Sequence, residues 1–290
     1  MMCDICSSKK VNFLFYSENM HGRNKISVEK FSVFSCGKCG VVFLKNVKIN
    51  NKYYQRYYGK DYYKTEVKYK VLNKAAKIIL LISVKIKEKI ILSYFKNDPK
   101  ITILDIGCND GQFLEKLNTK RFEKYGLELN TEAINNCRKK GIRMYEGDIT
   151  KVDFEDKKFD AVTLWHSLEH FKDPVKVFSK LKNILSDRGI IIIQTPNIDS
   201  FGFRYGRENW FHLDSPRHPY LYSRKTIEEL GKRTNLKIIG ITNEFYDYPL
   251  DLFWSIRSSP VKYIFYPFYP LVKYFSKEHL TYIVKKCEFD

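Results

Sequence analysis

The sequence predicts an α/β protein built on a mostly parallel sheet, with a small cysteine-rich unit ahead of it. Three observations lead to this fold class. From residue 101 onward, short β-branched apolar runs alternate with helical stretches, as in β-α-β units. The first of these runs ends in a turn that carries two glycines. Two Cys-x-x-Cys pairs precede it near the N-terminus.

The strand and turn at residues 101–111 are the stretch around which the other elements are arranged. The apolar run predicts a buried parallel strand, and the glycines turn the backbone into a helix predicted at 112–118. Because glycine lacks a Cβ, such a turn brings backbone N–H groups close to a ligand. The predicted ligand loop comprises Asp105, Gly107, Cys108, Asn109 and Gly111.

Two acidic residues follow at the ends of the next two predicted strands. The strand at 123–129 carries Glu128 about twenty residues after the first glycine, where nucleotide-binding folds place a carboxylate for two ribose hydroxyls. The strand at 142–146 is followed by Asp148 and Ile149. Two acids at successive strand ends suit an adenosine.

These features resemble the class I S-adenosylmethionine-dependent methyltransferases, whose first motif is a strand ending D-x-G-x-G-x-G. Here the motif reads D-x-G-x-x-x-G, with Asn109 where the middle glycine is usual. The resemblance implies S-adenosylmethionine as cofactor and a Rossmann-like, seven-stranded, mostly parallel sheet in the order 3-2-1-4-5-7-6. It also implies cofactor binding by Asp105, Gly107, Cys108, Asn109, Gly111, Glu128, Asp148, Ile149 and Trp165.

The charge balance favours negatively charged partners. The chain has 51 Lys+Arg against 33 Asp+Glu, a net charge of +18, which would attract nucleic acid, anionic membranes or phosphorylated substrates. The lysines are scattered, so a solvated lysine-rich surface explains the charge equally well. The N-terminus shows no secretion signal, so we expect a cytoplasmic protein, with the inner face of the membrane as an open alternative.

The N-terminal cysteines predict a structural zinc site in a ribbon formed by residues 1–48. Each pair offers two thiolates to one side of a tetrahedral ion. A unit this small buries too little apolar area to fold alone, and metal binding supplies the missing free energy. A redox dithiol or an iron site is the alternative. The predicted ligands are Cys3, Cys6, Cys36 and Cys39.

Residues 49–98 are expected to form a tyrosine-rich linker and a helix that covers the sheet. The tyrosines between 53 and 63 either stack on bases or sugars or simply pack the linker. The helix predicted at 66–95 has an apolar run too short to span a bilayer. It therefore packs on the sheet or lies on a membrane surface.

A cluster of candidate catalytic residues follows the fourth strand of the core, predicted at 159–164. The strand leads into Trp165 and the pattern His166-x-x-Glu169-His170. In such sheets ligands bind beyond the carboxyl ends of the strands, which places these side chains near the reactive end of the cofactor. The pattern also fits the inverzincin peptidases, but its residues leave a strand instead of lying on a long helix.

The same pattern resembles the ubiquinone-type O-methyltransferases and many envelope-sugar methyltransferases. Some of these hold a divalent ion at the positions that match His166, Glu169 and His170, although His166 stands where the ubiquinone enzymes have an acid. A purely structural role for Glu169 and His170 in the loop is the alternative. The sequence after this strand lacks the N-P-P-Y motif of enzymes that methylate nucleobase amino groups.

The core is predicted at 99–245, and within it a polar, aromatic segment at 200–222 forms a substrate lid. The lid's P-R-H-P-Y-L-Y-S string resembles the substrate-side insertion of methyltransferases in polysaccharide and secondary-metabolite pathways. Ser223 is expected to cap the next helix. Residues 246–290 should contribute an aromatic segment and the last strand of the core.

The cofactor's methyl group is already electrophilic, so the protein must align a nucleophile and accept its proton. Histidine suits this role for a hydroxyl or for a carbon beside a keto group. His166 and His170 are the main candidates, and His218 of the lid competes with them. The predicted catalytic set is His166, Glu169, His170 and His218.

The favoured function is O- or C-methylation of a small molecule or saccharide, such as a cell-envelope glycan precursor. The cysteine pairs and the G-C-N-D-G loop also resemble nucleotide-sugar C-methyltransferases, which are longer and carry a further C-terminal domain. Two alternatives stay open. One is an RNA methyltransferase whose ribbon reads the substrate, which the net charge of +18 would assist. The other is a non-catalytic cofactor-binding subunit.

Overall fold

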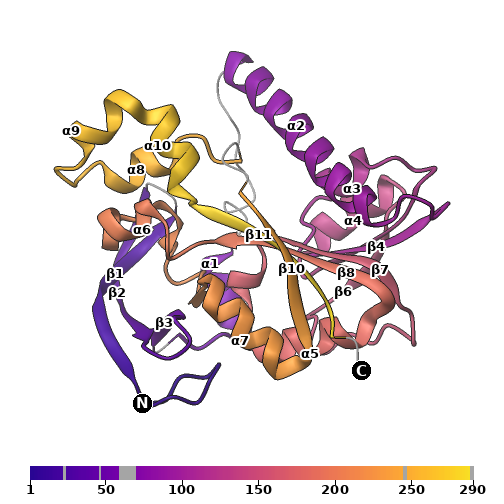
Figure 1. The fold of residues 1–290 in the computed structure, drawn as a ribbon, viewed down its shortest axis with the longest axis horizontal. Coiled ribbons are helices and arrows are strands. Elements are labelled where there is room, and N and C mark those ends of the chain that lie inside the picture. The colour runs from indigo at the N-terminus through magenta and orange to yellow at the C-terminus, as the bar shows by residue number, and fades with distance from the viewer. Residues whose placement is uncertain (22–23, 46, 59–69, 244–246, 288–290) are drawn as a thin grey trace.

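The computed structural model describes residues 1–290 except 22–23, 46, 59–69, 244–246 and 288–290 (Figure 1). Its larger sheet has seven strands in the order β10-β11-β8-β7-β4-β5-β6, and β11 alone runs antiparallel to both its neighbours. This arrangement corresponds to the expected 3-2-1-4-5-7-6. The strands are β4 (Ile101–Ile106), β5 (Phe122–Glu128), β6 (Arg143–Glu146), β7 (Phe159–Trp165), β8 (Leu185–Pro196), β10 (Leu236–Thr242) and β11 (His279–Lys286).

Helices cover both faces of this sheet (Figure 1). The alternation of β4 separates the two layers: Ile101 and Ile103 belong to one apolar cluster, and Leu104 and Ile106 belong to the other. The first cluster includes side chains of α2 (Lys70–Tyr94), α3 (Gln112–Lys116) and α4 (Thr131–Lys139). The second includes side chains of α5 (Pro174–Ile184) and α7 (Arg224–Thr234).

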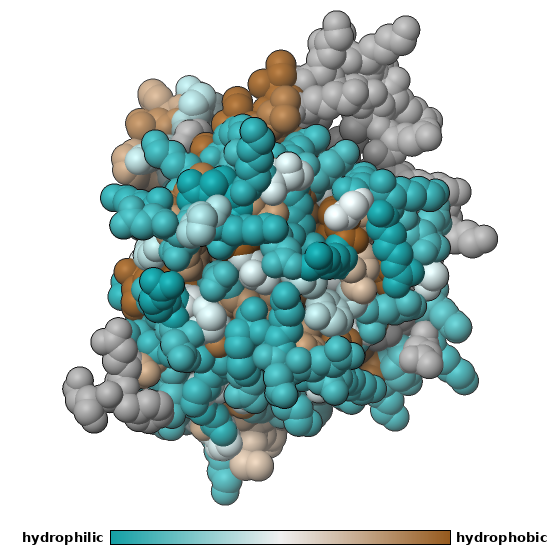
Figure 2. Space-filling view, turned by 90° about the vertical axis from the view of Figure 1, so that its right-hand side faces the viewer, coloured by the Kyte–Doolittle hydropathy of each residue, from teal (hydrophilic) through white to brown (hydrophobic). Residues whose placement is uncertain are grey.

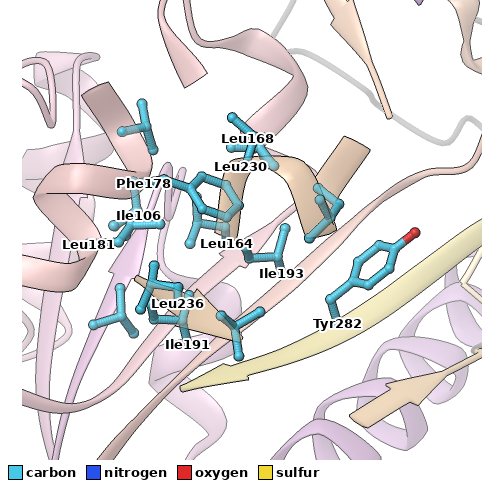
Figure 3. Packing of buried hydrophobic residues seen from close by; sticks show 14 of the residues in the cluster. Ile106, Leu164, Leu168, Phe178, Leu181, Ile191, Ile193, Leu230, Leu236 and Tyr282 are labelled. Atoms are coloured by element: carbon cyan, nitrogen blue, oxygen red, sulfur yellow. The ribbon is translucent and has the colours of Figure 1, made fainter. Parts of the chain in front are cut away.

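The second cluster is the larger of the two. Figure 3 shows side chains of the sheet packing against those of α5 and α7, among them Ile106, Leu164, Ile191, Ile193, Phe178, Leu181 and Leu230. All but Ile106, at 1% exposure, are fully buried. Each such side chain contributes about 1.5–3 kcal/mol through its removal from water. This burial fixes the carboxyl edge of the sheet, where the candidate site lies.

The local predictions agree with the structure in most elements. Ser223 caps α7 through the expected hydrogen bond to the backbone of Thr226, whose hydroxyl completes a capping box. The predicted covering helix is α2, which begins at Lys70; its expected start at 66 lies outside the described residues. In the ribbon, β1 (Val11–His21) and β2 (Asn24–Cys36) form a long antiparallel pair.

The ribbon and the lid share one small sheet. Its order is β1-β2-β3-β9, in which β3 (Val42–Lys45) comes from the ribbon and β9 (Tyr220–Leu221) from the lid. Val42 pairs with Leu221, and the neighbouring carbonyl of Pro219 accepts a hydrogen bond from the ribbon backbone. The ribbon is therefore fixed to the segment that was expected to cover the substrate.

The C-terminal segment supports the other side of the lid (Figure 1). The indole of Trp210 donates to Glu278 at 2.9 Å, and the ring of Phe201 stacks on Phe265. The segments involved are α6 (Phe201–Gly206), η2 (Arg207–Asn209) and η3 (Phe211–Leu213) in the lid, and α8 (Asp251–Ile256), α9 (Lys262–Phe265), η4 (Tyr266–Phe268) and α10 (Tyr269–Ser276) after it. Among the described residues, no helix has the length and apolar character needed to cross a bilayer.

Two tyrosines of α1 (Asn51–Tyr57), Tyr53 and Tyr57, and Tyr58 after the helix contact other parts of the protein. The Tyr53 hydroxyl donates to the carbonyl of Pro216, and the Tyr57 hydroxyl donates to Glu29 at 2.7 Å. Tyr58 reaches the site described below. The side chain of Tyr54 and the tyrosines at 62 and 63 lie outside the described part of the chain, so the base-stacking hypothesis stays untested there.

The four N-terminal cysteine sulfurs form one buried group. The Sγ atoms of Cys3 and Cys39 are 3.6 Å apart, those of Cys6 and Cys36 are 3.5 Å apart, and all four lie within 4.8 Å of one another. Four thiolates about 2.3 Å from a zinc ion lie about 3.8 Å from each other, so the group fits tetrahedral zinc. The carbonyl of Cys39 also accepts a hydrogen bond from Thr226, which connects the group to α7.

Replacing Cys36 and Cys39 together by serine should abolish one bound zinc per chain. The melting temperature should fall by about 5 °C or more, because metal binding contributes folding free energy to the small sheet. Metal analysis and calorimetry of the purified protein measure both effects. Cys287→Ser, outside the group and half-buried, is the matched control and should keep its zinc. An unchanged zinc content in the double variant would refute the assignment.

Candidate functional site

The two glycines of the ligand loop both adopt conformations and positions that exclude a side chain. Gly107 has φ +71° and Gly111 has φ +74°, in the left-handed region that favours glycine. A Cβ on Gly107 would lie 2.9 Å from the Cβ of Ser167, and one on Gly111 would lie 2.7 Å from Ile142. At both glycines the loop backbone packs directly against neighbouring side chains, with no room for a Cβ.

Glu128 stands beside this loop at the end of β5. One carboxylate oxygen accepts the backbone N–H of Asn109 at 3.0 Å, and the other accepts those of Leu129 and Asn130 at 2.8 and 3.1 Å. These bonds fix the orientation of a half-buried carboxylate at the loop. Because each oxygen has further lone pairs, the carboxylate can still accept hydrogen bonds from the hydroxyls of a ligand.

The other predicted cofactor residues occupy different environments. Asp105 is buried beneath the loop, where burial raises the pKa of its carboxyl to about 7 and the Thr163 hydroxyl donates to it at 2.7 Å. Asp148 accepts the N–H and hydroxyl of Thr150 and so closes its own turn. The sulfur of Cys108 is buried beside Gly126, and its backbone forms part of the loop. Ile149 is fully buried.

Trp165 and His166 end β7 on the same edge of the sheet. Trp165 is half-buried, and the ammonium of Lys87 from α2 lies 4.5 Å from its ring centre. His166 has φ +51°, a sparsely populated conformation for a residue other than glycine, and its N–H donates to Gln194 on β8. This turn directs the chain into the short helix η1 (Leu168–His170).

The structure brings the four predicted catalytic residues together. Glu169 is fully buried, and one of its oxygens accepts the hydroxyl proton of Thr195 at 3.0 Å. The other oxygen lies 3.7 Å from Nδ1 of His166 and has no hydrogen-bond partner in the described part of the chain. The rings of His170 and His218 are 4.7 Å apart. A donor atom from each of Glu169, His170 and His218 lies within 4.8 Å of the other two.

The hydrogen bonds of the two neighbouring histidines assign their tautomers. Nδ1 of His170 lies 2.9 Å from the carbonyl of Arg217, and Nδ1 of His218 lies 2.7 Å from the carbonyl of His212. A carbonyl only accepts, so each Nδ1 carries the proton and each Nε2 keeps its lone pair. The hydroxyl of Tyr58, also 2.9 Å from Nδ1 of His170, donates to Arg217.

At neutral pH neither imidazole carries a second proton, because burial lowers the pKa of both. It lowers the pKa of His170 to about 4, with a further contribution from His218, and it lowers the pKa of His218 below its usual value. Burial alone would raise the pKa of Glu169, but the imidazoles of His166, His218 and His170 hold it at about 2. At neutral pH the cluster is therefore a carboxylate and two neutral imidazoles, three acceptors able to take a proton or a cation.

Sequence reasoning missed a second group of donors beside the first. His212, Asp251 and His279 also place one donor atom each within 4.8 Å. The ring of His279 lies 5.2 Å from that of His166 and 4.9 Å from that of His212. The chain has only 6 histidines, and five of them gather here, a concentration between 166 and 279 that the sequence already displays.

Comparison with known proteins gives a consistent family. Residues 81–240, more than half of the chain, match the model of the methyltransferase domain. A tRNA U34 carboxymethyltransferase of Nautilia profundicola is 31% identical over 100 residues, 32% of this chain and 33% of that protein. A ubiquinone biosynthesis O-methyltransferase of Pasteurella multocida is 27% identical over 111 residues, 33% of this chain and 46% of that protein. The matches thus span a third to under half of the length of these relatives.

Solved structures show the same fold at low identity. The plantazolicin methyltransferase BamL, solved with a triazolic desmethylPZN analog and SAH, covers 80% of this chain and 92% of its own with a TM-score of 0.55 and 20% identity. Its relative BpumL gives a TM-score of 0.53 over 81% of this chain at 20% identity. With the glycine loop, the acid on β5 and the sheet order described above, the family match shows that this chain belongs to the methyltransferase domain family.

Proposed function

We propose that the protein transfers the methyl group of S-adenosylmethionine to a hydroxyl or an acidic carbon of a small molecule or saccharide. The observation that carries this proposal is the acceptor cluster of buried Glu169 and His218 with half-buried His170 at the carboxyl edge of the sheet. It lies on the side where the glycine loop and Glu128 would hold the cofactor. Envelope-glycan precursors are the substrate class that we favour.

The proposed cofactor site combines a bare loop with an oriented carboxylate. The loop from Gly107 to Gly111 would approach the ligand with its backbone, and Glu128 would accept the two ribose hydroxyls. Asp148 and Ile149 would border the adenine from the next strand end. Trp165, Asp105, Cys108 and Asn109 complete the set, with Asp105 and Cys108 acting from below the loop.

The acceptor cluster would remove the proton of the nucleophile. The bound cofactor supplies an electrophilic methyl group, and the protein aligns the acceptor with it. As the new bond to oxygen forms, the hydroxyl proton becomes strongly acidic, so a base with a pKa of about 4, as in His170, can accept it. The carboxylate of Glu169 stabilises the resulting imidazolium, Nε2 of the neutral His218 offers a second acceptor beside it, and His166 lies next to Glu169.

The position of the lid supports a small substrate over a nucleic acid. His218 comes from the lid, and the lid is held between the ribbon sheet and the C-terminal helices. A fully buried Glu169 suits a small acceptor or a protruding group better than a groove for a long strand. The tRNA enzyme among the relatives and the net charge of +18 keep RNA as the alternative substrate.

The C-terminal helices also support association with a membrane surface, where lipid-linked substrates reside. Large apolar side chains are exposed on α9, η4 and α10: Tyr263 at 76%, Ile264 at 65%, Phe268 at 64% and Leu271 at 61%. The face drawn in Figure 2, on the side of the molecule away from α9 in Figure 1, is mostly hydrophilic. We propose that α9, η4 and α10 contact anionic lipid.

Replacing Glu128 by glutamine should weaken the binding of S-adenosylhomocysteine about tenfold or more. The ribose hydroxyls lose a charged hydrogen-bond acceptor that contributes about 1.5–3 kcal/mol. Isothermal titration calorimetry measures the affinity. Glu132→Ala, which removes an exposed carboxylate one turn along the chain, is the matched control and should bind normally. Equal affinities in the two variants would contradict the proposed cofactor site.

Labelled methyl transfer by the purified protein should appear in a nucleotide-sugar and glycolipid extract and not in total RNA. With that acceptor, His170→Gln and His218→Gln should each lower kcat by about 10²–10⁴. The affinity for S-adenosylhomocysteine should not change. Label confined to RNA would overturn the substrate proposal.

The pH profile of the same reaction tests the base itself. Because the deprotonated imidazole is the active form and burial holds the pKa of His170 at about 4, kcat/KM should be level near neutral pH and should fall as the pH decreases through about 4. The groups facing His170 are His218, Glu169 and Asp214. An ascending limb centred near pH 6.5 in the wild type would contradict the assignment.

The membrane proposal is tested by sedimentation with vesicles of phosphatidylglycerol and phosphatidylcholine. The wild type should sediment with them, and the triple variant Tyr263→Ser, Phe268→Ser, Leu271→Ser should remain in the supernatant. The double variant Phe13→Ser, Tyr16→Ser removes exposed aromatics of the ribbon and is the control. A triple variant that sediments like the wild type would refute this surface.

A further inference from the structure

The second donor group joins three segments that lie far apart in the sequence. His212 belongs to η3 of the lid, Asp251 begins α8 and His279 begins β11. Their exposed fractions are 5%, 2% and 1%. The group is separate from the acceptor cluster described above, and the proposed methyl transfer uses none of its three side chains.

One oxygen of Asp251 faces both imidazoles. Its Oδ2 lies 2.9 Å from Nε2 of His212 and 3.6 Å from Nε2 of His279. Two ligands about 2.1 Å from a common ion lie about 3.0–3.4 Å from each other. The two observed separations lie just below and just above the distance expected between neighbouring ligands of one ion.

The other oxygen of Asp251 is held by the protein. Its Oδ1 accepts one hydrogen bond from the ammonium of Lys273 and another from the backbone N–H of Leu252, each at 2.5 Å. Hydrogen bonds of this kind orient the carboxylate ligands of metal sites. They leave Oδ2 free to serve as a monodentate ligand toward the two imidazoles.

His279 supplies the second, independent observation. Both of its ring nitrogens lack a hydrogen-bond partner among the described residues, although the side chain is almost completely buried. Nε2 of the adjacent His166 is likewise buried without a partner in that part of the chain. Burial of an unsatisfied polar group costs about 1–3 kcal/mol, so three such atoms in one place indicate a missing ligand.

We propose that His212, Asp251 and His279 bind a divalent first-row transition metal ion. Two imidazoles and one carboxylate form the donor set of open zinc and non-haem iron sites, which keep coordination positions for a further ligand. A simple His212–Asp251 hydrogen bond would explain the 2.9 Å contact but would leave His279 unsatisfied. The site is argued from these residues alone and does not depend on the proposed reaction.

The test uses Mn²⁺ as the probe on protein loaded with a single equivalent of zinc per chain, which the four ribbon thiolates bind in preference to a site of nitrogen and oxygen donors. Thiolates retain zinc, whereas Mn²⁺ prefers nitrogen and oxygen donors, so the two sites are read separately. Electron paramagnetic resonance of free Mn²⁺ should show one ion bound per chain beyond the zinc. His279→Gln and His212→Gln should each weaken this binding at least about tenfold.

Two controls give the other outcomes. His218→Gln and Glu169→Gln alter the acceptor cluster and should leave Mn²⁺ binding unchanged. Loss of Mn²⁺ in these variants, with retention in His279→Gln, would place the ion in the acceptor cluster and overturn the proposal. Absence of binding by Mn²⁺, Co²⁺ and Fe²⁺ would also overturn it. S-adenosylhomocysteine affinity shows that each variant is folded, and the two histidines come from different segments, so one unfolded variant leaves the other to decide.

Discussion

The structure depends on ion pairs that neutralise the charge of acidic side chains at the carboxyl edge of the large sheet. Asp214 pairs with Arg217, Asp251 with Lys273 and Asp247 with Lys87, at 2.8, 2.5 and 3.0 Å. An uncompensated charge in such surroundings would be very costly, so each pair constrains the segments that supply its members. Together the pairs fix the lid, connect α8 to α10 and attach the covering helix α2.

Glu169 differs from these three acids, since its buried carboxylate accepts a hydrogen bond from the Thr195 hydroxyl and has imidazoles as neighbours. No Lys or Arg among the described residues forms an ion pair with it. The same edge thus contains three carboxylates that are each paired with a lysine or arginine and one, Glu169, whose neighbours are imidazoles.

Much of the fold could be predicted because the signals are local. The alternation of apolar runs and helices, the glycine turn and the Ser223 cap depend on neighbours within a few residues, and the structure has them where expected. The carboxyl ends of the strands also predict which side chains meet, and they indicated that His166, Glu169 and His170 lie together. The pairing of His218 with them needed the lid hypothesis as well.

The rest could not be predicted because it depends on contacts across long sequence separations. Nothing near His279 or Asp251 marks them as partners, and they meet only when β11 is inserted beside β8 and α8 packs under the lid. The sharing of a sheet by the ribbon and the lid was missed for the same reason. A two-residue strand such as β9 has no periodicity to detect.

The pairing of β3 with β9 has a consequence for biosynthesis. The hydroxyl of Tyr220 also donates to Asp4, so the first residues of the chain are completed by residues more than two hundred positions later. On the ribosome, β1 to β3 emerge before β9, so one edge of β3 is unpaired until β9 has been made. Such an edge can pair with other chains. A zinc ion bound by the four thiolates during this interval would hold β1 to β3 in shape until β9 pairs with them.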